Sequence, residues 1–121
     1  MKNILLIGKL NDLVKEINQY LSKDFHMQLS SENLEMIRGM LKVLEPDLIL
    51  LDYEMPVCDG RQTLEMIRAD EEISDIPVIF LTGVNDREHI EMVLALRSAG
   101  YLLKPPVKER LLGEIKKAVG V

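Results

Sequence analysis

The chain has 121 residues, of which 47% are hydrophobic, and this size and composition fit one compact domain that spans residues 1–121 and has its own core. Acidic residues outnumber basic residues to give a formal net charge of -5, which argues against direct binding of nucleic acid. The apolar run at the N-terminus is interrupted by Gly8 and Lys9 before it reaches the length of a secretory signal or a membrane span, so we expect a cytoplasmic protein without a membrane segment.

The first part of the chain alternates between strand and helix patterns. The apolar run from Asn3 to Ile7 has the length of a strand, and a helix follows it. A second, weaker strand runs from Phe25 to Leu29 and is expected at an edge of the sheet. Ser31 can cap a second helix, which Pro46 stops. The inward residues of the two helices are Leu13, Val14, Ile17, Tyr20 and Leu21, then Leu34, Ile37, Leu41 and Leu44.

The segment after the second helix contains a strand that ends in an acidic residue. The run Leu48–Leu51 is apolar on both alternate faces, which is typical of a strand covered on both sides in a parallel sheet. It ends in Asp52, and Pro56 and Gly60 indicate that a turn follows. Open α/β folds bind ligands at the carboxyl ends of their strands. This segment alone leaves two interpretations open: Asp52 ends the strand as a polar residue, or it belongs to a site.

The remaining segments continue the alternation. Asp59 and Gln62 resemble a capping box that opens a third helix, and the strand Val78–Leu81 then ends in Thr82. A second capping-box pattern opens a fourth helix at Asn85. The inward residues of the third and fourth helices are Leu64, Met66, Ile67, Ile90, Val93, Leu94 and Leu96.

The last predicted strand, Tyr101–Leu103, ends in Lys104, and a proline corner leads into a fifth helix. The inward residues of that helix are Leu111, Leu112, Ile115 and Ala118. Gly39 and Gly113 fall inside the second and fifth predicted helices and indicate close packing against neighbouring elements.

Five strands that alternate with five helices across short connections predict an α/β fold with a doubly wound parallel sheet. Right-handed crossovers place the carboxyl ends of all strands along one edge. The residues expected at that edge are Gly8, Lys9, Asp52, Thr82 and Lys104. A carboxylate, a hydroxyl and an ammonium group that converge from three strands favour the interpretation of Asp52 as part of a site.

These three groups suit phosphoryl transfer. A carboxylate can attack phosphorus and form an aspartyl phosphate, and nearby groups must then neutralise the charge on the phosphoryl oxygens. Thr82 could donate its hydroxyl to one oxygen, and Lys104 could pair with another. Such chemistry normally uses a divalent metal with oxygen ligands, but no second carboxylate follows the first strand.

The chain resembles the receiver domains of response regulators in bacterial two-component signalling. The motifs are LLDYEMPVCDG around Asp52, FLT ending at Thr82 and YLLKP around Lys104, and the resemblance covers essentially the whole chain. It implies a flavodoxin-like fold with strand order 2-1-3-4-5. It also implies that Asp52 is the phosphoacceptor, that Thr82 and Lys104 contact the phosphate, and that Tyr101 is an aromatic switch whose rotamer follows Thr82.

The resemblance also implies partners. A histidine kinase or a phosphotransfer protein would supply the phosphate, and the surface of the fourth helix, fifth strand and fifth helix would dock a downstream protein or a fused output domain. Such a domain is not an enzyme, beyond phosphorylating itself from a phosphodonor and removing its own phosphate.

Two departures from the family pattern affect these expectations. Receivers carry two adjacent acidic residues after the first strand to hold magnesium, whereas this chain has Gly8 and Lys9 there. Unit charges about 4 Å apart interact by about 4 kcal/mol at an effective dielectric constant near 20, so this exchange of charge argues against magnesium. Asp52 is the one candidate ligand, Lys9 could pair with it instead, and Glu54 is either an added ligand or a solvated loop residue.

The second departure is Arg97, which stands where the family commonly has a glycine, four residues before the switch aromatic. A left-handed conformation is unfavourable for arginine, so we expect the fourth helix to continue toward Ala99, with Gly100 as its exit.

Three functions remain open. The first is a phosphorylatable receiver that uses Asp52, and the second is a pseudo-receiver that acts as a phosphorylation-independent protein-interaction module. The third is a flavodoxin-like enzyme or small-molecule binder, against which the lack of a glycine-rich phosphate loop argues.

Overall fold

The computed structural model describes residues 2–9, 11–30, 33–52, 60–82, 91, 95, 98–103 and 106–120. Its elements are β1 (Asn3–Ile7), α1 (Asp12–Leu21), β2 (His26–Ser30), α2 (Leu34–Leu44), β3 (Leu48–Asp52), α3 (Gly60–Ala69), β4 (Val78–Thr82), β5 (Gly100–Leu103) and α5 (Lys108–Val119). The described residues thus contain five strands and four helices rather than the five helices predicted. Most of the predicted fourth helix lies outside them, and the two residues described within it, Glu91 and Ala95, are helical.

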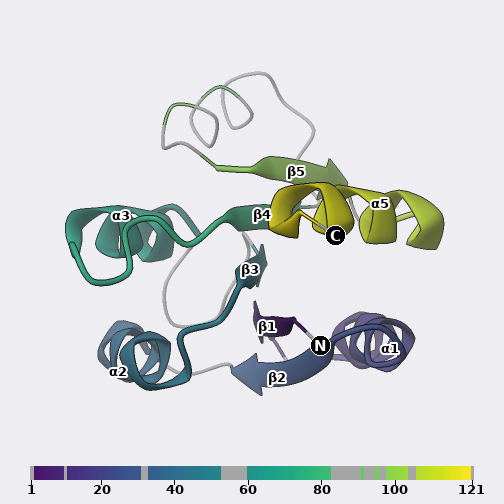
Figure 1. Ribbon diagram of the computed structural model, residues 1–121, viewed down its shortest axis with the longest axis horizontal. Helices are drawn as coiled ribbons and strands as arrows, with labels where there is room; N and C mark the ends of the chain where they lie inside the picture. The colour runs from purple at the N-terminus through teal and green to yellow at the C-terminus, as the bar shows by residue number, and fades with distance from the viewer. Residues whose placement is uncertain are drawn as a thin grey trace.

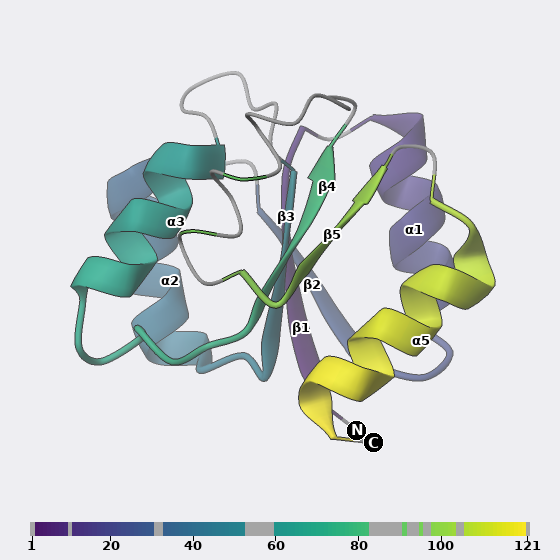
Figure 2. The same ribbon diagram turned by 90° about the horizontal axis from the view of Figure 1, so that it is seen from above.

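The five strands form one sheet in the order β2-β1-β3-β4-β5, and every neighbouring pair is parallel. Helices α1 and α5 cover one face of this sheet, and α2 and α3 cover the other (Figure 1, Figure 2). This is the predicted doubly wound architecture with the predicted strand order. Strand β3 lies at the centre of the sheet, so its carboxyl end is flanked by strands on both sides.

The two faces of the sheet have separate hydrophobic cores because alternate strand residues point to opposite sides. The core under α1 and α5 includes Ile4, Leu6, Val14, Ile17, Leu21, Leu48, Leu50, Leu111 and Ile115. The core under α2 and α3 includes Leu5, Ile7, Ile37, Leu41, Ile49, Leu51, Leu64 and Ile67. All five residues of β3 are buried, which confirms the prediction of a central strand covered on both faces.

The helix ends show why these segments begin and stop where they do. The side chain of Asn11 caps α1 by accepting a hydrogen bond from the amide of Val14. Asn33, not Ser31, caps α2, and its side-chain oxygen lies 3.0 Å from the amide nitrogen of Met36. Both residue types are good caps, so composition alone did not separate them. Helix α2 ends as predicted before Pro46, with Glu45 in the left-handed conformation at φ 45°.

The bounds of β2 and the entry into β5 differ from the sequence predictions. Strand β2 begins one residue later than expected, because Phe25 belongs to the core beneath α1 and is only 3% exposed. The fourth helix does not continue to Ala99, since Ser98 is not helical and the amide of Ala99 donates to the carbonyl oxygen of Val78 at 2.7 Å. This hydrogen bond leads the chain into β5, so Gly100 is a strand residue rather than a helix exit.

The remaining predictions about the fold have different outcomes. The predicted capping residue Asp59 lies outside the described residues, as does Arg97. The prediction that Gly39 and Gly113 mark close packing is wrong, because a Cβ atom added at either glycine would meet no atom within 4 Å. Among the described residues, no helix is long and apolar enough to cross a membrane.

Candidate functional site

The strand register brings the predicted site positions to one edge of the sheet. Asp52, the last residue of β3, lies beside Leu81 of β4. On the other side Ile7 pairs with Leu51, so Gly8 follows at the level of Asp52. Strand β4 ends one residue later at Thr82. The carboxyl ends of β1, β3 and β4 therefore meet, as expected for a parallel sheet.

Two predicted site residues, Lys104 and Glu54, lie outside the described part of the chain. Lys104 directly follows Leu103, which pairs with Thr82 across β4 and β5. The backbone of the described residues thus leads to the same edge from β5. The backbone of Thr82 forms the last residue of β4.

Asp52 is almost completely buried, with 1% of its surface exposed. The other buried polar residues that the structure describes are Ser30 and Thr63, so Asp52 is the one ionisable side chain among them. Burying a carboxylate costs stability unless hydrogen bonds or opposite charges compensate. Asp52 is therefore a carboxyl group held inside the fold, at the edge where open α/β sheets bind ligands.

Gly8 lies directly against Asp52. Its amide donates to the carbonyl oxygen of Ser30 at 2.9 Å and continues the pairing of β1 with β2. A Cβ atom built on Gly8 would lie 2.8 Å from the Cβ of Asp52 and 3.4 Å from its Oδ2. Separations below 3.0 Å do not occur between real Cβ atoms and their neighbours, so a side chain here would displace the aspartate. The sequence marked Gly8 only as a missing acid, and it gave no sign of this contact.

Lys9 is placed differently from its neighbour. Its side chain is exposed, and its backbone oxygen accepts a hydrogen bond from the amide of Asn11 just before α1. The ion pairs formed among the described residues do not include one between Lys9 and Asp52. The predicted pairing of these two side chains is therefore not formed in this conformation.

The donors that the structure describes at this edge do not by themselves fit magnesium. Magnesium prefers six oxygen ligands in near-octahedral geometry, with one or more carboxylates from the protein. No group of three or more His, Cys, Asp or Glu side chains that could hold a metal occurs in the described part of the chain. At the ends of β1 and β3, Asp52 supplies one carboxylate, Gly8 supplies none, and Lys9 is a cation.

Tyr101, the predicted switch residue, lies in β5 opposite Phe80 of β4. Its side chain is half-buried and packs against the core under α2 and α3. A half-buried aromatic ring on an edge strand can occupy more than one rotamer, but the same position also suits a tyrosine with a purely structural role. The switch role stays a prediction.

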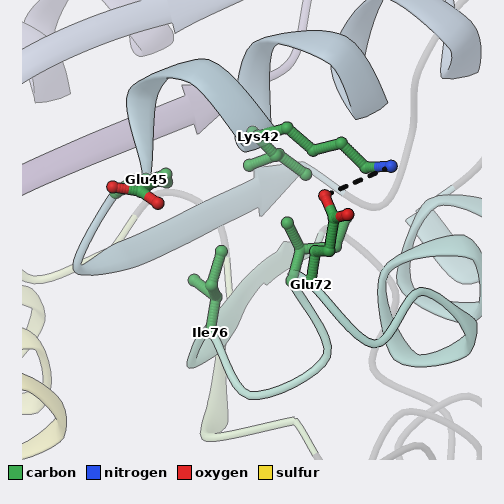
Figure 3. Close-up of a pocket in the computed structure, with 7 residues that line it drawn as sticks. Lys42, Glu45, Glu72 and Ile76 are labelled. Atoms are coloured by element: carbon green, nitrogen blue, oxygen red, sulfur yellow. Dashed lines mark ion pairs between the residues drawn. The ribbon is translucent and has the colours of Figure 1, made fainter.

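A cavity lies at the opposite edge of the sheet. It has a volume of about 390 Å³ and its lining residues are Leu41, Lys42, Glu45, Pro46, Glu72, Ile73 and Ile76 (Figure 3). These residues come from the end of α2 and from the connection that leads to β4, both near the amino ends of the strands. The cavity is therefore separated from Asp52 by the length of β3.

An ion-pair cluster around Asp70 borders this cavity. Its Oδ2 lies 2.9 Å from Nε of Arg38 and 3.2 Å from Nζ of Lys42, which also pairs with Glu72. Burial works to raise the pKa of Asp70, but hydrogen bonds from the Glu72 amide, Lys42 and Arg38 outweigh it and lower this pKa. Sequence analysis missed the cluster because Arg38 and Asp70 are 32 positions apart and carry no motif.

Comparison with known proteins agrees with this architecture. Residues 4–116 match the family described as response regulator receiver domain. "Probable transcriptional regulator ycf29" of Porphyra purpurea is 31% identical over 118 residues, which cover 97% of this chain and 56% of that protein. "Probable C4-dicarboxylate response regulator DctR" of Halalkalibacterium halodurans is 35% identical over 111 residues, which cover 89% of this chain and 47% of that protein.

A solved structure supports the fold. The signal receiver domain of a DNA binding response regulator protein (merR) from Colwellia psychrerythraea superimposes with a TM-score of 0.87 at 22% identity, and the match covers 100% of both chains. This chain spans about half the length of the two curated relatives, 56% and 47%. The match over residues 4–116 covers nearly the whole sequence, so the chain belongs to the response regulator receiver domain family of two-component signalling.

Proposed function

We propose that this chain is a phosphorylatable receiver in which Asp52 accepts a phosphoryl group. The observation that carries the proposal is the buried carboxylate of Asp52 at the carboxyl end of the central strand β3, where open α/β sheets bind ligands. A carboxylate oxygen attacks phosphorus, the bond from phosphorus to the leaving group breaks, and the leaving group departs with the electron pair. The product is an aspartyl phosphate on Asp52.

Two further side chains are assigned to the phosphate. Thr82 ends β4 beside β3, and Lys104 follows β5, so both come from strands on the same side of Asp52. The hydroxyl of Thr82 would donate a hydrogen bond to one phosphoryl oxygen, and the ammonium group of Lys104 would neutralise another. Tyr101 would change rotamer when Thr82 moves toward the phosphate, which would alter the surface around β5.

The proposal includes partners on both sides of the reaction. The phosphate would come from a histidine kinase or a phosphotransfer protein, whose imidazole nitrogen leaves as the aspartyl phosphate forms. The output would be a protein target or a fused output domain that contacts the fourth helix, β5 and α5. The relatives named above are regulators about twice as long as this chain, which supports an output outside residues 1–121.

A second candidate function is a pseudo-receiver, a module that binds protein partners without being phosphorylated. The observation that favours it is Gly8, which removes one of the family's acidic positions and lies against Asp52. In this case Asp52 would be retained for packing over Gly8 rather than for chemistry. The two candidates differ in one measurable property, covalent phosphorylation of Asp52.

Intact-mass spectrometry after incubation with acetyl phosphate, with and without magnesium, separates the candidates. The phosphorylatable receiver predicts a phosphoryl adduct that Asp52→Asn abolishes. Asp70→Asn is the matched control, because it makes the same chemical change at the opposite edge of the sheet and should keep the adduct. Absence of any adduct under both conditions would reject phosphorylation and leave the pseudo-receiver.

A further inference from the structure

The backbone conformation of Gly8 does not explain why this position is a glycine. Among the described residues, the one glycine with a positive φ is Gly120, so Gly8 does not need the left-handed region that glycine favours. Its hydrogen bond to the carbonyl oxygen of Ser30 uses the amide, which every residue except proline has. The requirement for glycine therefore comes from the side-chain space.

That space is taken by Asp52. The closest atom to a Cβ built on Gly8 is the Cβ of Asp52 at 2.8 Å, followed by Oδ2 at 3.4 Å and Cγ at 3.6 Å. These three side-chain atoms of Asp52 thus lie within 4 Å of the place that a Cβ atom of residue 8 would take. Gly8 is buried and the neighbouring strands are paired, so moving the backbone of β1 or β3 to relieve the contact would disturb strand pairing and core packing.

The contact between Gly8 and Asp52 affects whether this edge can bind magnesium. An acidic side chain at position 8 would need the volume that Asp52 occupies, and the next residue, Lys9, is an exposed cation that would repel a divalent ion. Position 8 therefore provides no second carboxylate, because the residue is a glycine and because Asp52 occupies the space that an acidic side chain would need. The residues that the structure describes there do not form the donor set that magnesium requires.

We propose that the close contact between Gly8 and Asp52, which we call the steric pair, takes the place of an acidic residue at position 8. Asp52 of this receiver is then phosphorylated without a divalent metal. The proposal rests on the proposed phosphorylation of Asp52. In the step with acetyl phosphate, an Asp52 oxygen forms a bond to phosphorus, the bond from phosphorus to the acetate oxygen breaks, and acetate leaves with the electron pair. No co-reactant is consumed.

The metal part is tested on the full chain by two measurements. Calorimetric titration with magnesium chloride, and thermal unfolding in magnesium chloride against sodium chloride of equal ionic strength, report binding whether or not phosphorylation occurs. We expect no saturable heat and no rise in the unfolding midpoint. We also expect acetyl phosphate to give the adduct at the same rate in EDTA as in magnesium chloride. Saturable magnesium binding, or an adduct that forms only with magnesium, would overturn the proposal.

A different outcome separates the two proposals of this article. If no adduct forms under any condition and magnesium still does not bind, the phosphorylation of Asp52 is wrong. The metal-free character of the pocket would then be supported by the binding data alone.

The steric part is tested by Gly8→Ala in three backgrounds. In the wild-type chain the added methyl group meets the Cβ of Asp52, so the unfolding midpoint should fall by several degrees. Asp52→Ala keeps that Cβ and should keep most of the fall, whereas Asp52→Gly removes it and should abolish the fall. An equal fall in the Asp52→Gly background would show that the methyl group meets something else, and it would overturn the steric pair.

Discussion

Two aspartates at opposite edges of the sheet show how differently one side chain is used in this fold. Asp70, near the amino ends of the strands, receives hydrogen bonds from Arg38 and from the Glu72 amide, and its side chain is 11% exposed. Asp52, at the carboxyl end of β3, is 1% exposed and lies over a glycine. The first connects α2 to the segment that follows α3, while the second ends β3, whose five residues are all buried.

We therefore expect the two aspartates to have different roles, Asp70 in stability and Asp52 in function. Against the effect of burial, hydrogen bonds from the Glu72 amide, Lys42 and Arg38 lower the pKa of Asp70, which means that its ionised form stabilises the fold. The carboxyl group of Asp52 has lost nearly all its contact with bulk water and lies at the carboxyl end of the central strand. Of the two aspartates, Asp52 is therefore the one that we propose as the site of chemistry, because it lies at the edge where open α/β sheets bind ligands.

The largest expected effect concerns the stability of the two edges. Asp70→Asn should lower the free energy of unfolding at neutral pH, because its ionised form accepts hydrogen bonds from Arg38 and Lys42 in the fold. Urea denaturation of this variant and of Asp52→Asn against wild type compares the two edges. No loss of stability in Asp70→Asn would mean that its charge does not stabilise this edge, and the comparison would fail.

The sequence predicted the centre of this fold better than its edges. The bounds of β1 and the end of β3 at Asp52 were predicted correctly, because their apolar runs are covered on both faces and have sharp polar ends. Strand β2 was shifted by one residue, since Phe25 is buried whether or not it pairs in the sheet. An apolar residue next to an edge strand signals burial but does not fix the hydrogen-bond register.

The placement of the candidate residues at strand ends was predictable from the sequence, but their contacts were not. The positions of Asp52 and Thr82 at neighbouring strand ends follow from parallel topology, which local patterns indicate. The approach of Gly8 to Asp52 within 2.8 Å depends on the packing of two strands and could not be derived from either segment alone. The same holds for the cluster around Asp70, whose members come from distant parts of the chain.

The backbone at Gly8 and at Glu45 allows a smaller test of the comparison between the two edges of the sheet. At the carboxyl edge Gly8 is required for space, whereas at the amino edge Glu45 holds a left-handed conformation, φ 45° and ψ 58°, without being a glycine. Glu45→Gly should raise the free energy of unfolding by about 1 kcal/mol, because glycine adopts this conformation without the steric penalty. Glu45→Ala keeps the penalty and removes the charge, so it is the matched control in thermal unfolding. Equal stabilisation by both variants would assign the effect to the charge instead.

The smallest effect is the pH dependence that Asp70 adds. Because its pKa is lowered in the folded chain, the stabilisation by its ionised form is complete above the unfolded pKa of about 3.9 and is lost as the pH falls through the folded value. The stability difference between wild type and Asp70→Asn should therefore stay constant from neutral pH to about pH 5, then shrink below about pH 4. Since Arg38 and Lys42 are partly exposed, high salt should also shrink it. Urea denaturation across this pH range measures the difference, and a gap that widens toward low pH would show that Asp70 does not stabilise this edge through its charge.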